Sequence, residues 1–202
     1  MVARNDDLGR ARHARTIVLV EGRSDEAAVE AAAARLGRSL DEEGASILPI
    51  GGAHAVGRFL DVLGPRGLDK RLAGLCDAGE EAEFRRGLER AGVGSSLTRR
   101  DMEQFGFYVC DADLEDELIR ALGASSVERI LDGHGDLGSF RTLQKQPAWQ
   151  GRPRDEQLRR FMGSGGNRKI RYARLLVEAL EPSRLLRPLR GLLDHLATAA
   201  ST

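Results

Sequence analysis

The chain has 202 residues, of which 41% are hydrophobic and 31% are charged, and it carries no net charge at pH 7, which is typical of a soluble folded domain. No apolar run approaches the roughly 20 residues that cross a bilayer, and residues 1–15 lack the apolar centre of a secretory signal. We therefore expect a cytoplasmic protein with no membrane partner. Two cysteines, Cys76 and Cys110, are too few for a disulfide framework or a four-cysteine zinc site, so we expect both thiols in the core.

Four short apolar segments alternate with segments of helical periodicity in the first part of the chain. The expected strands are residues 16–20, 46–50, 72–76 and 107–110. An amphipathic helix follows each strand, with apolar positions three and four apart around residues 24–36, 56–63, 84–91 and 114–122. This alternation predicts an α/β fold, in which a parallel sheet of about four strands is flanked by helices.

The rest of the chain has the periodicity of helices alone. We expect them at residues 125–133, 137–145, 154–162, 169–180 and 188–199. We divide the chain into an α/β core, residues 16–136, and a C-terminal helical extension, residues 137–199, that packs on the core or continues it.

Charge is distributed unevenly between the two parts. Residues 1–136 carry 18 Lys and Arg against 26 Asp and Glu, a net charge of −8, whereas residues 137–190 carry 13 against 4, a net charge of +9. An acidic first part and a basic second part fit a metal site joined to a surface that binds a polyanion. The alternative is that the solvated helices are merely rich in arginine.

Acidic residues follow three of the four expected strands. The carboxyl ends of parallel strands line one edge of a sheet, where ligands bind, so these side chains should converge. The candidate metal ligands are Glu21, Asp25, Asp77, Asp111, Asp113 and Glu115. Carboxylates packed this closely repel one another unless a hard cation lies between them, and oxygen ligands suit Mg²⁺ or Mn²⁺ rather than zinc. Each acid alone also suits the first turn of a helix, but the coincidence at three strands favours a metal site.

Several motifs resemble the TOPRIM domain, the catalytic fold shared by topoisomerases, primases and the nucleases of the OLD (overcoming lysogenization defect) family. The run IVLVEGRSDEAAVEAAAARLG resembles the opening motif, in which a strand delivers a Glu-Gly pair, and ILPIGGAHAVGRFLDVLG resembles the second strand and its Gly-Gly turn. The position of the family's Asp-x-Asp motif is occupied by LAGLCDAGEE. The OLD-type fourth strand is resembled by FYVCDADLEDELIRAL, and the OLD-type C-terminal element is resembled by GGNRKIRYARLLVEAL. The resemblance spans roughly residues 16–180 and implies a Rossmann-like TOPRIM sheet with a C-terminal helical extension.

The resemblance also implies roles for individual residues. Glu21 matches a catalytic, metal-binding glutamate and Asp25 the acid four places on, while Asp77 matches the first aspartate of Asp-x-Asp. The paired ligand positions after the fourth strand match Asp113 and Glu115. Mg²⁺ or Mn²⁺ is the implied cofactor, with two ions in the site.

Gly79 departs from the family pattern, because it stands where the second aspartate of Asp-x-Asp belongs. One ion would then bind weakly, unless Glu80 or Glu81 reaches into the site or the pair Asp111 and Asp113 compensates. The sequence does not rank these alternatives.

Lys169 matches the catalytic lysine of the OLD pattern. From the residues alone it is one cation among several on a solvated helix, and its neighbours Arg168, Arg171 and Arg174 are candidates for binding the nucleic-acid backbone. A lysine at a helix start after a glycine loop is well placed to contact a phosphate. Trp149 and Phe140 flank a basic stretch and could stack on bases, or be buried against neighbouring helices.

The function that these features imply is metal-dependent hydrolysis of DNA phosphodiester bonds by a two-metal TOPRIM mechanism, with DNA favoured over RNA. OLD proteins couple the domain to an ATPase domain. No G-x-x-x-x-G-K-[ST] motif is present in this sequence, so ATP dependence would require a separate ATPase partner. The alternatives are an RNA-processing TOPRIM nuclease and a non-catalytic nucleic-acid-binding or adaptor module, which Gly79 favours.

Overall fold

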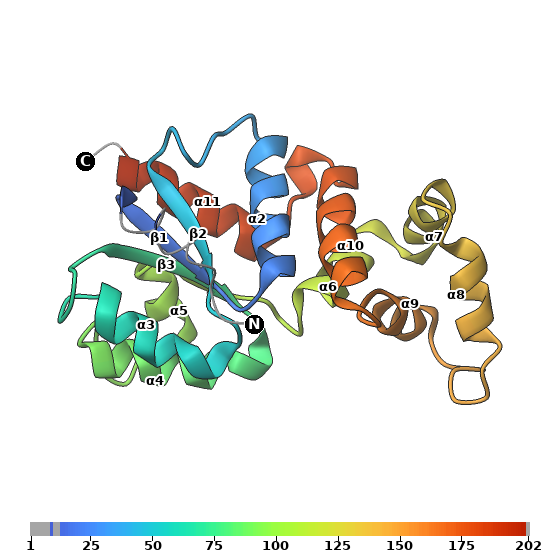
Figure 1. Cartoon of the computed structure of the whole chain (residues 1–202), viewed down its shortest axis with the longest axis horizontal. Helices are drawn as coiled ribbons and strands as arrows, with labels where there is room; N and C mark the ends of the chain where they lie inside the picture. The colour runs from blue at the N-terminus through green and yellow to red at the C-terminus, as the bar shows by residue number, and fades with distance from the viewer. Residues whose placement is uncertain (1–8, 10–12, 201–202) are drawn as a thin grey trace.

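The computed structural model describes residues 9 and 13–200. Within this part of the chain, four strands form one parallel sheet in the order β2-β1-β3-β4 (Figure 1). The strands are β1 (Thr16–Val20), β2 (Ala45–Pro49), β3 (Arg71–Cys76) and β4 (Phe107–Val109). This confirms the α/β class, and each expected strand is correct to within one residue at either end.

Helices cover both faces of the sheet, because successive side chains of a strand point to opposite sides. Ile17 and Leu19 of β1 belong to the core on one face, and Val18 and Val20 belong to the core on the other. The first face is covered by α3 (Val56–Leu63), α4 (Glu81–Ala91) and α5 (Arg99–Gln104). The second face is covered by α2 (Arg23–Arg35) and α11 (Arg187–Ala200).

The helices between β4 and α11 extend the molecule to one side (Figure 1). They are α6 (Leu114–Leu122), α7 (Ala124–Gly133), α8 (Leu137–Gln144), α9 (Arg154–Met162) and α10 (Gly166–Ala179). α10 packs along α2, whereas α7, α8 and α9 project away from the sheet; we call these three helices the arm. The rings of Phe140 and Phe161 meet edge to face at 5.5 Å in the arm. Both belong to the apolar core that covers the second face of the sheet, so this core continues into the arm.

Some features differ from the sequence expectations. α5 was not predicted, although Thr98 and Asp101 form a capping box at its start. α10 begins at Gly166, so Lys169 lies within its first turn rather than at its first residue. Cys76 and Cys110 are buried, as expected. None of the helices in the described residues is long and apolar enough to cross a membrane.

Candidate functional site

The carboxyl ends of β1 and β3 present the acids that the sequence analysis singled out. Glu21 directly follows β1, and its backbone carbonyl accepts hydrogen bonds of 3.1 Å from the amides of both Gly51 and Gly52. These glycines have φ angles of 81° and 115°, and residues other than glycine rarely adopt such positive φ angles. The Gly-Gly turn after β2 therefore fixes the backbone of Glu21.

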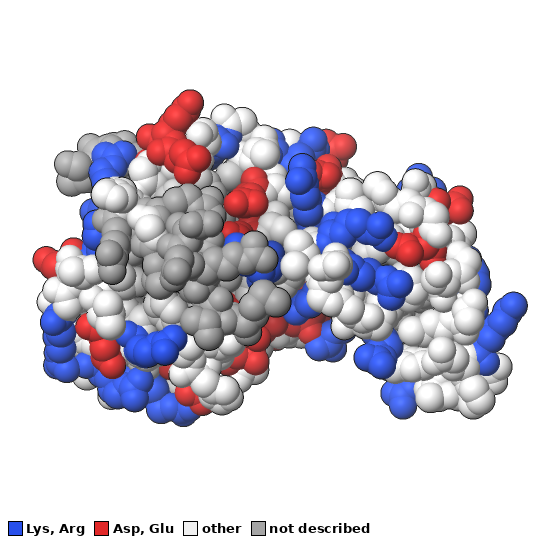
Figure 2. Space-filling view, viewed as in Figure 1, with Lys and Arg blue, Asp and Glu red and all other residues white. Residues whose placement is uncertain are grey.

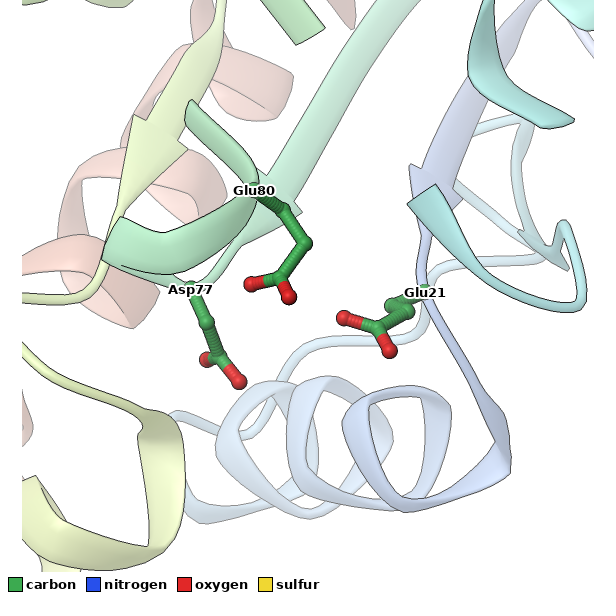
Figure 3. Close-up of side chains that lie close together, drawn as sticks. All are labelled: Glu21, Asp77 and Glu80. Carbon is green, nitrogen blue, oxygen red and sulfur yellow. The ribbon is translucent and has the colours of Figure 1, made fainter. Parts of the chain in front are cut away.

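Three carboxylates converge at this edge of the sheet. Glu21, Asp77 and Glu80 each offer an oxygen within 4.8 Å of the others, and all three side chains are half-buried. Figure 3 shows them directed toward one another, Glu21 from the end of β1, Asp77 from the end of β3, and Glu80 from the short 3₁₀ helix η2 (Ala78–Glu80). The group could hold a metal ion. The structure thus favours Glu80 among the alternatives for the missing aspartate.

Glu81 takes a different direction from Glu80. Its carboxylate forms an ion pair of 2.7 Å with Arg99 and another of 3.6 Å with Arg85. The two neighbouring glutamates point in different directions because Glu80 is the last residue of η2 and faces the cluster, whereas Glu81 is the first residue of α4.

Asp25 and Asp77 are held in surroundings that disfavour their charged forms. Burial raises the pKa of Asp25 to about 7. Two smaller effects lower this pKa, namely a hydrogen bond of 2.8 Å from the Gly22 amide and the positive charge of Lys169. Burial and the charge of Asp25 raise the pKa of Asp77 to about 8. Burial and the charge of Glu80 also raise the pKa of Glu21. The ionised forms of these carboxylates are therefore costly in the protein alone, and a bound cation would stabilise them.

Asp113 and Glu115, at the start of α6, have cationic partners. Asp113 caps the helix by accepting a hydrogen bond of 2.8 Å from the Asp116 amide, and its other oxygen pairs with Arg159 of α9. The ammonium of Lys169 lies 3.4 Å from Oε1 of Glu115. That oxygen is fully buried and has no hydrogen-bond partner among the described residues, so the contact is an ion pair without hydrogen-bond geometry.

Lys169 interacts with the cluster while 39% of its side chain remains exposed. Burial lowers its pKa, but the charges of Glu115, Asp25 and Asp77 outweigh burial, so the pKa is raised. Lys169 also lowers the pKa values of Glu21 and Asp25. The lysine is therefore close enough to these carboxylates to interact with their charges.

Asp111 lies apart from the other candidate acids. Its carboxylate is 78% exposed and pairs with Arg99 at 3.2 Å, and its amide donates to Glu117 at 2.6 Å. The charges that raise the pKa of Asp77 most belong to Asp25, Glu115 and Asp113. The structure brings five of the six candidate ligands together and leaves Asp111 with Arg99.

The three candidate backbone-binding arginines lie on α10 near Lys169, and each has a partner. Arg168 stacks over the Phe161 ring at 4.3 Å, Arg171 pairs with Asp136, and Arg174 pairs with Glu178 at 2.6 Å. Arg171 and Arg174 are exposed and Arg168 is half-buried. A phosphate would therefore have to compete with these carboxylates for Arg171 and Arg174.

Arg159 is a residue of the site that no local motif marks. It contacts Asp113 across a separation of 46 residues. In the sequence it is distinguished only by its position in the basic stretch after residue 136. The cluster among the described residues therefore contains six carboxylates (Glu21, Asp25, Asp77, Glu80, Asp113 and Glu115) against two cations (Arg159 and Lys169), which leaves a net charge of −4 when all are ionised.

The first part of the chain matches a known family model. Residues 13–78 match the family model of the OLD-like TOPRIM domain, named after the overcoming lysogenization defect protein. No curated protein matches the sequence of the chain.

Solved structures give matches over nearly the whole chain. The C-terminal region of the Xanthomonas campestris pv. campestris OLD protein, phased with platinum, has a TM-score of 0.72 and 24% identity over 96% of this chain and 97% of that chain. The same region phased with mercury has a TM-score of 0.70 and 23% identity over 93% and 97%. The C-terminal region of the Burkholderia pseudomallei OLD protein has a TM-score of 0.68 and 22% identity over 93% and 98%. At these identities the likeness shows a shared fold.

Proposed function

We propose that this chain, of which residues 13–78 match the OLD-like TOPRIM domain, is a metal-dependent nuclease that hydrolyses DNA phosphodiester bonds. The observation that supports this most strongly is the convergence of carboxylates from β1, β3, η2 and α6 around one lysine. A structural ion-pair network would balance its charges, whereas six carboxylates meet two cations among the described residues of this cluster, and the pKa values of Asp25 and Asp77 are raised to about 7 and about 8. Such an excess is typical of a site completed by divalent cations.

The donor atoms fit Mg²⁺ or Mn²⁺. All are carboxylate oxygens, the ligands that hard divalent cations prefer, and the buried Oε1 of Glu115 lacks a hydrogen-bond partner among the described residues. Glu21, Asp77 and Glu80 would hold one ion, and Asp113 and Glu115 would contribute to a second. We leave Asp111 out of the ligand set because its side chain is 78% exposed, whereas Asp113, which also pairs with an arginine, is buried and its charge acts on Asp77.

Two such ions would supply an activated water and stabilise the leaving oxygen. The chain's own groups have separate roles. Asp25 adds negative charge beside Asp77 and fixes the Gly22 turn through its hydrogen bond. Lys169, held by Glu115 in this structure, would neutralise charge that develops on the phosphate.

The arm and α10 are proposed to hold the substrate backbone. Arginines are distributed over this part of the surface (Figure 2), and Arg159 reaches from α9 to Asp113 at the acidic edge. Phosphate contacts of this kind position a nucleic acid without reading its sequence. DNA is the substrate that we favour over RNA, and a separate ATPase partner would account for any ATP dependence.

The test is to incubate the purified protein with supercoiled plasmid DNA and with a structured RNA, in Mg²⁺, in Mn²⁺ and in EDTA. We expect nicked or linear plasmid in either metal and intact plasmid in EDTA. Cleavage of RNA alone would instead identify an RNA-processing enzyme.

A non-catalytic nucleic-acid-binding module is the second candidate, and Gly79 in place of the aspartate favours it. Binding of plasmid DNA in a mobility-shift assay, without cleavage of either nucleic acid in any metal, would support this candidate and overturn the proposed nuclease.

A further inference from the structure

We propose that Trp149, with Arg152 and Arg160, forms a stacking subsite for an unpaired nucleobase of the substrate. The inference rests on the proposed function and adds a substrate class to it: DNA that presents unpaired nucleotides beside the acidic cluster.

The Trp149 ring lies at the edge of the apolar core of the arm. Its backbone carbonyl accepts a hydrogen bond of 2.7 Å from the buried side-chain amide of Gln157, and its side chain packs against the core while staying partly exposed. Phe140, the other residue that the sequence suggested for base stacking, is fully buried against Phe161. Only Trp149 of this pair can therefore meet a ligand.

Two guanidinium groups lie over the Trp149 ring. Cζ of Arg152 is 5.5 Å and Cζ of Arg160 is 5.9 Å from the ring centroid, both within the range of a cation–π contact. Both arginines are exposed. A base has the same flat π-face as these guanidinium groups, so it can replace one of them on the ring while that arginine moves to the adjacent phosphate.

A cavity of about 470 Å³ lies next to the ring, lined by Trp149, Glu156, Arg159, Arg160 and Gly163. This volume is within the range of about 300–1,000 Å³ that small-molecule sites occupy. Two arginines against one glutamate give the lining an excess of positive charge, and Gly163 presents no side chain that would fill the space. An aromatic wall, cationic neighbours and an open volume are what a nucleotide requires.

Arg159 connects this cavity to the acidic edge. It lines the cavity on α9, and its guanidinium pairs with Asp113, which we propose as a metal ligand. A nucleotide stacked on Trp149 would therefore lie close to the phosphodiester at the metal site. Bases in an intact duplex are stacked on one another and cannot reach the ring, so the subsite selects unpaired nucleotides.

Trp149 is the single tryptophan of the sequence, so the intrinsic fluorescence of the protein reports on this ring directly. The experiment titrates the whole chain with a ten-nucleotide oligothymidine and with an abasic oligonucleotide of the same number of phosphates. EDTA is present throughout, so the readout does not depend on cleavage. We expect saturable quenching by oligothymidine, binding roughly 5- to 100-fold tighter than that of the abasic strand, and little quenching by the abasic strand.

Variants test whether Trp149 causes the preference for oligothymidine over the abasic strand. Affinities for the two labelled strands are measured by fluorescence anisotropy. Trp149→Phe should keep the preference, because phenylalanine also stacks, whereas Trp149→Ala should bind both strands equally. Arg86→Ala, on the outside of α4, removes one positive charge elsewhere and should keep the preference.

Equal affinity of the wild type for the two strands would overturn the subsite even if Trp149→Ala did not fold, and so would a preference that persists in a folded Trp149→Ala. Failure of the proposed nuclease would look different, as intact plasmid in every metal. Each idea can therefore fail without the other.

Discussion

Replacing Asp25 with asparagine removes one charge from the acidic cluster with little change in shape. Asp25 is 9% exposed and accepts a hydrogen bond from the Gly22 amide at the start of α2. The amide oxygen of asparagine can accept the same bond, so the capping of the helix is kept. What the substitution removes is the cost of ionising a buried carboxyl beside Asp77 and Glu115.

The magnitude follows from the pKa of Asp25, which burial raises from 3.8 to about 7. At roughly 1.4 kcal/mol per pKa unit, an ionised Asp25 costs the folded protein about 4 kcal/mol. That pKa already includes the opposing effects of the Gly22 amide and of Lys169. Because the polar amide of asparagine also costs free energy to bury, we expect Asp25→Asn to raise the free energy of unfolding by about 2 kcal/mol at pH 8.5 in EDTA.

The sign of the pH dependence is also fixed. Between pH 3.8 and about pH 7 the folded protein keeps a proton on Asp25 that the unfolded chain has released, so the free energy of unfolding falls as the pH rises. Asp77 acts in the same direction up to about pH 8. The wild type in EDTA should therefore be less stable at pH 8.5 than at pH 5.5, and Asp25→Asn should lose less stability over this range.

Urea unfolding followed by circular dichroism, at both pH values and in EDTA, measures these free energies. Glu83→Gln, which alters an acid paired with Arg86 on the outside of α4, is the matched control and should change the free energy by less than about 0.5 kcal/mol. An Asp25→Asn protein no more stable than the wild type at pH 8.5 would refute the electrostatic reasoning for the cluster.

Three further predictions concern the chemistry and the basic surface. Cleavage should be faster in Mn²⁺ than in Mg²⁺, since Mn²⁺ binds an incomplete site more tightly. Gly79→Asp should bring the two rates closer together, because it adds a carboxylate at a position where a Cβ meets no atom within 4 Å. An unchanged ratio would mean that the added carboxylate binds no ion. Lys169→Ala should lower turnover by about 10²- to 10³-fold with little loss of DNA affinity; a loss of affinity alone would make the lysine part of the electrostatic surface. Neutralising Arg171 and Arg174 together should weaken DNA binding at every sequence and reduce the slope of log affinity against log salt by roughly one to two; an unchanged slope would place the backbone elsewhere.

Local patterns predicted the fold well. Each strand is a short apolar run bounded by an acid or a glycine, and parallel strands deliver the residues after their carboxyl ends to one edge. That topological rule is enough to bring Glu21 and Asp77 together. The rule does not give the direction of a side chain in a loop. It therefore could not predict that Asp111 pairs with Arg99 and lies apart from the other acids.

Other parts of the site depend on contacts that no local pattern encodes. Glu80 reaches the cluster because η2 turns the chain by a single 3₁₀ turn, and Arg159 reaches Asp113 because α9 folds back against α6. Trp149 and Phe140 look equivalent in the sequence, yet helix packing buries Phe140 fully and leaves Trp149 partly exposed.

The central claim is that the carboxylates at the end of the sheet form the catalytic metal site. Its most direct test is the rate of plasmid cleavage in Mn²⁺ by wild type, Glu21→Gln and Glu83→Gln, purified in the same way, with folding checked by circular dichroism. Glu21 belongs to the converging group, so we predict that Glu21→Gln loses cleavage while Glu83→Gln cuts at the wild-type rate. A folded Glu21→Gln protein that cuts plasmid as fast as the wild type would contradict the assignment of this cluster as the active site.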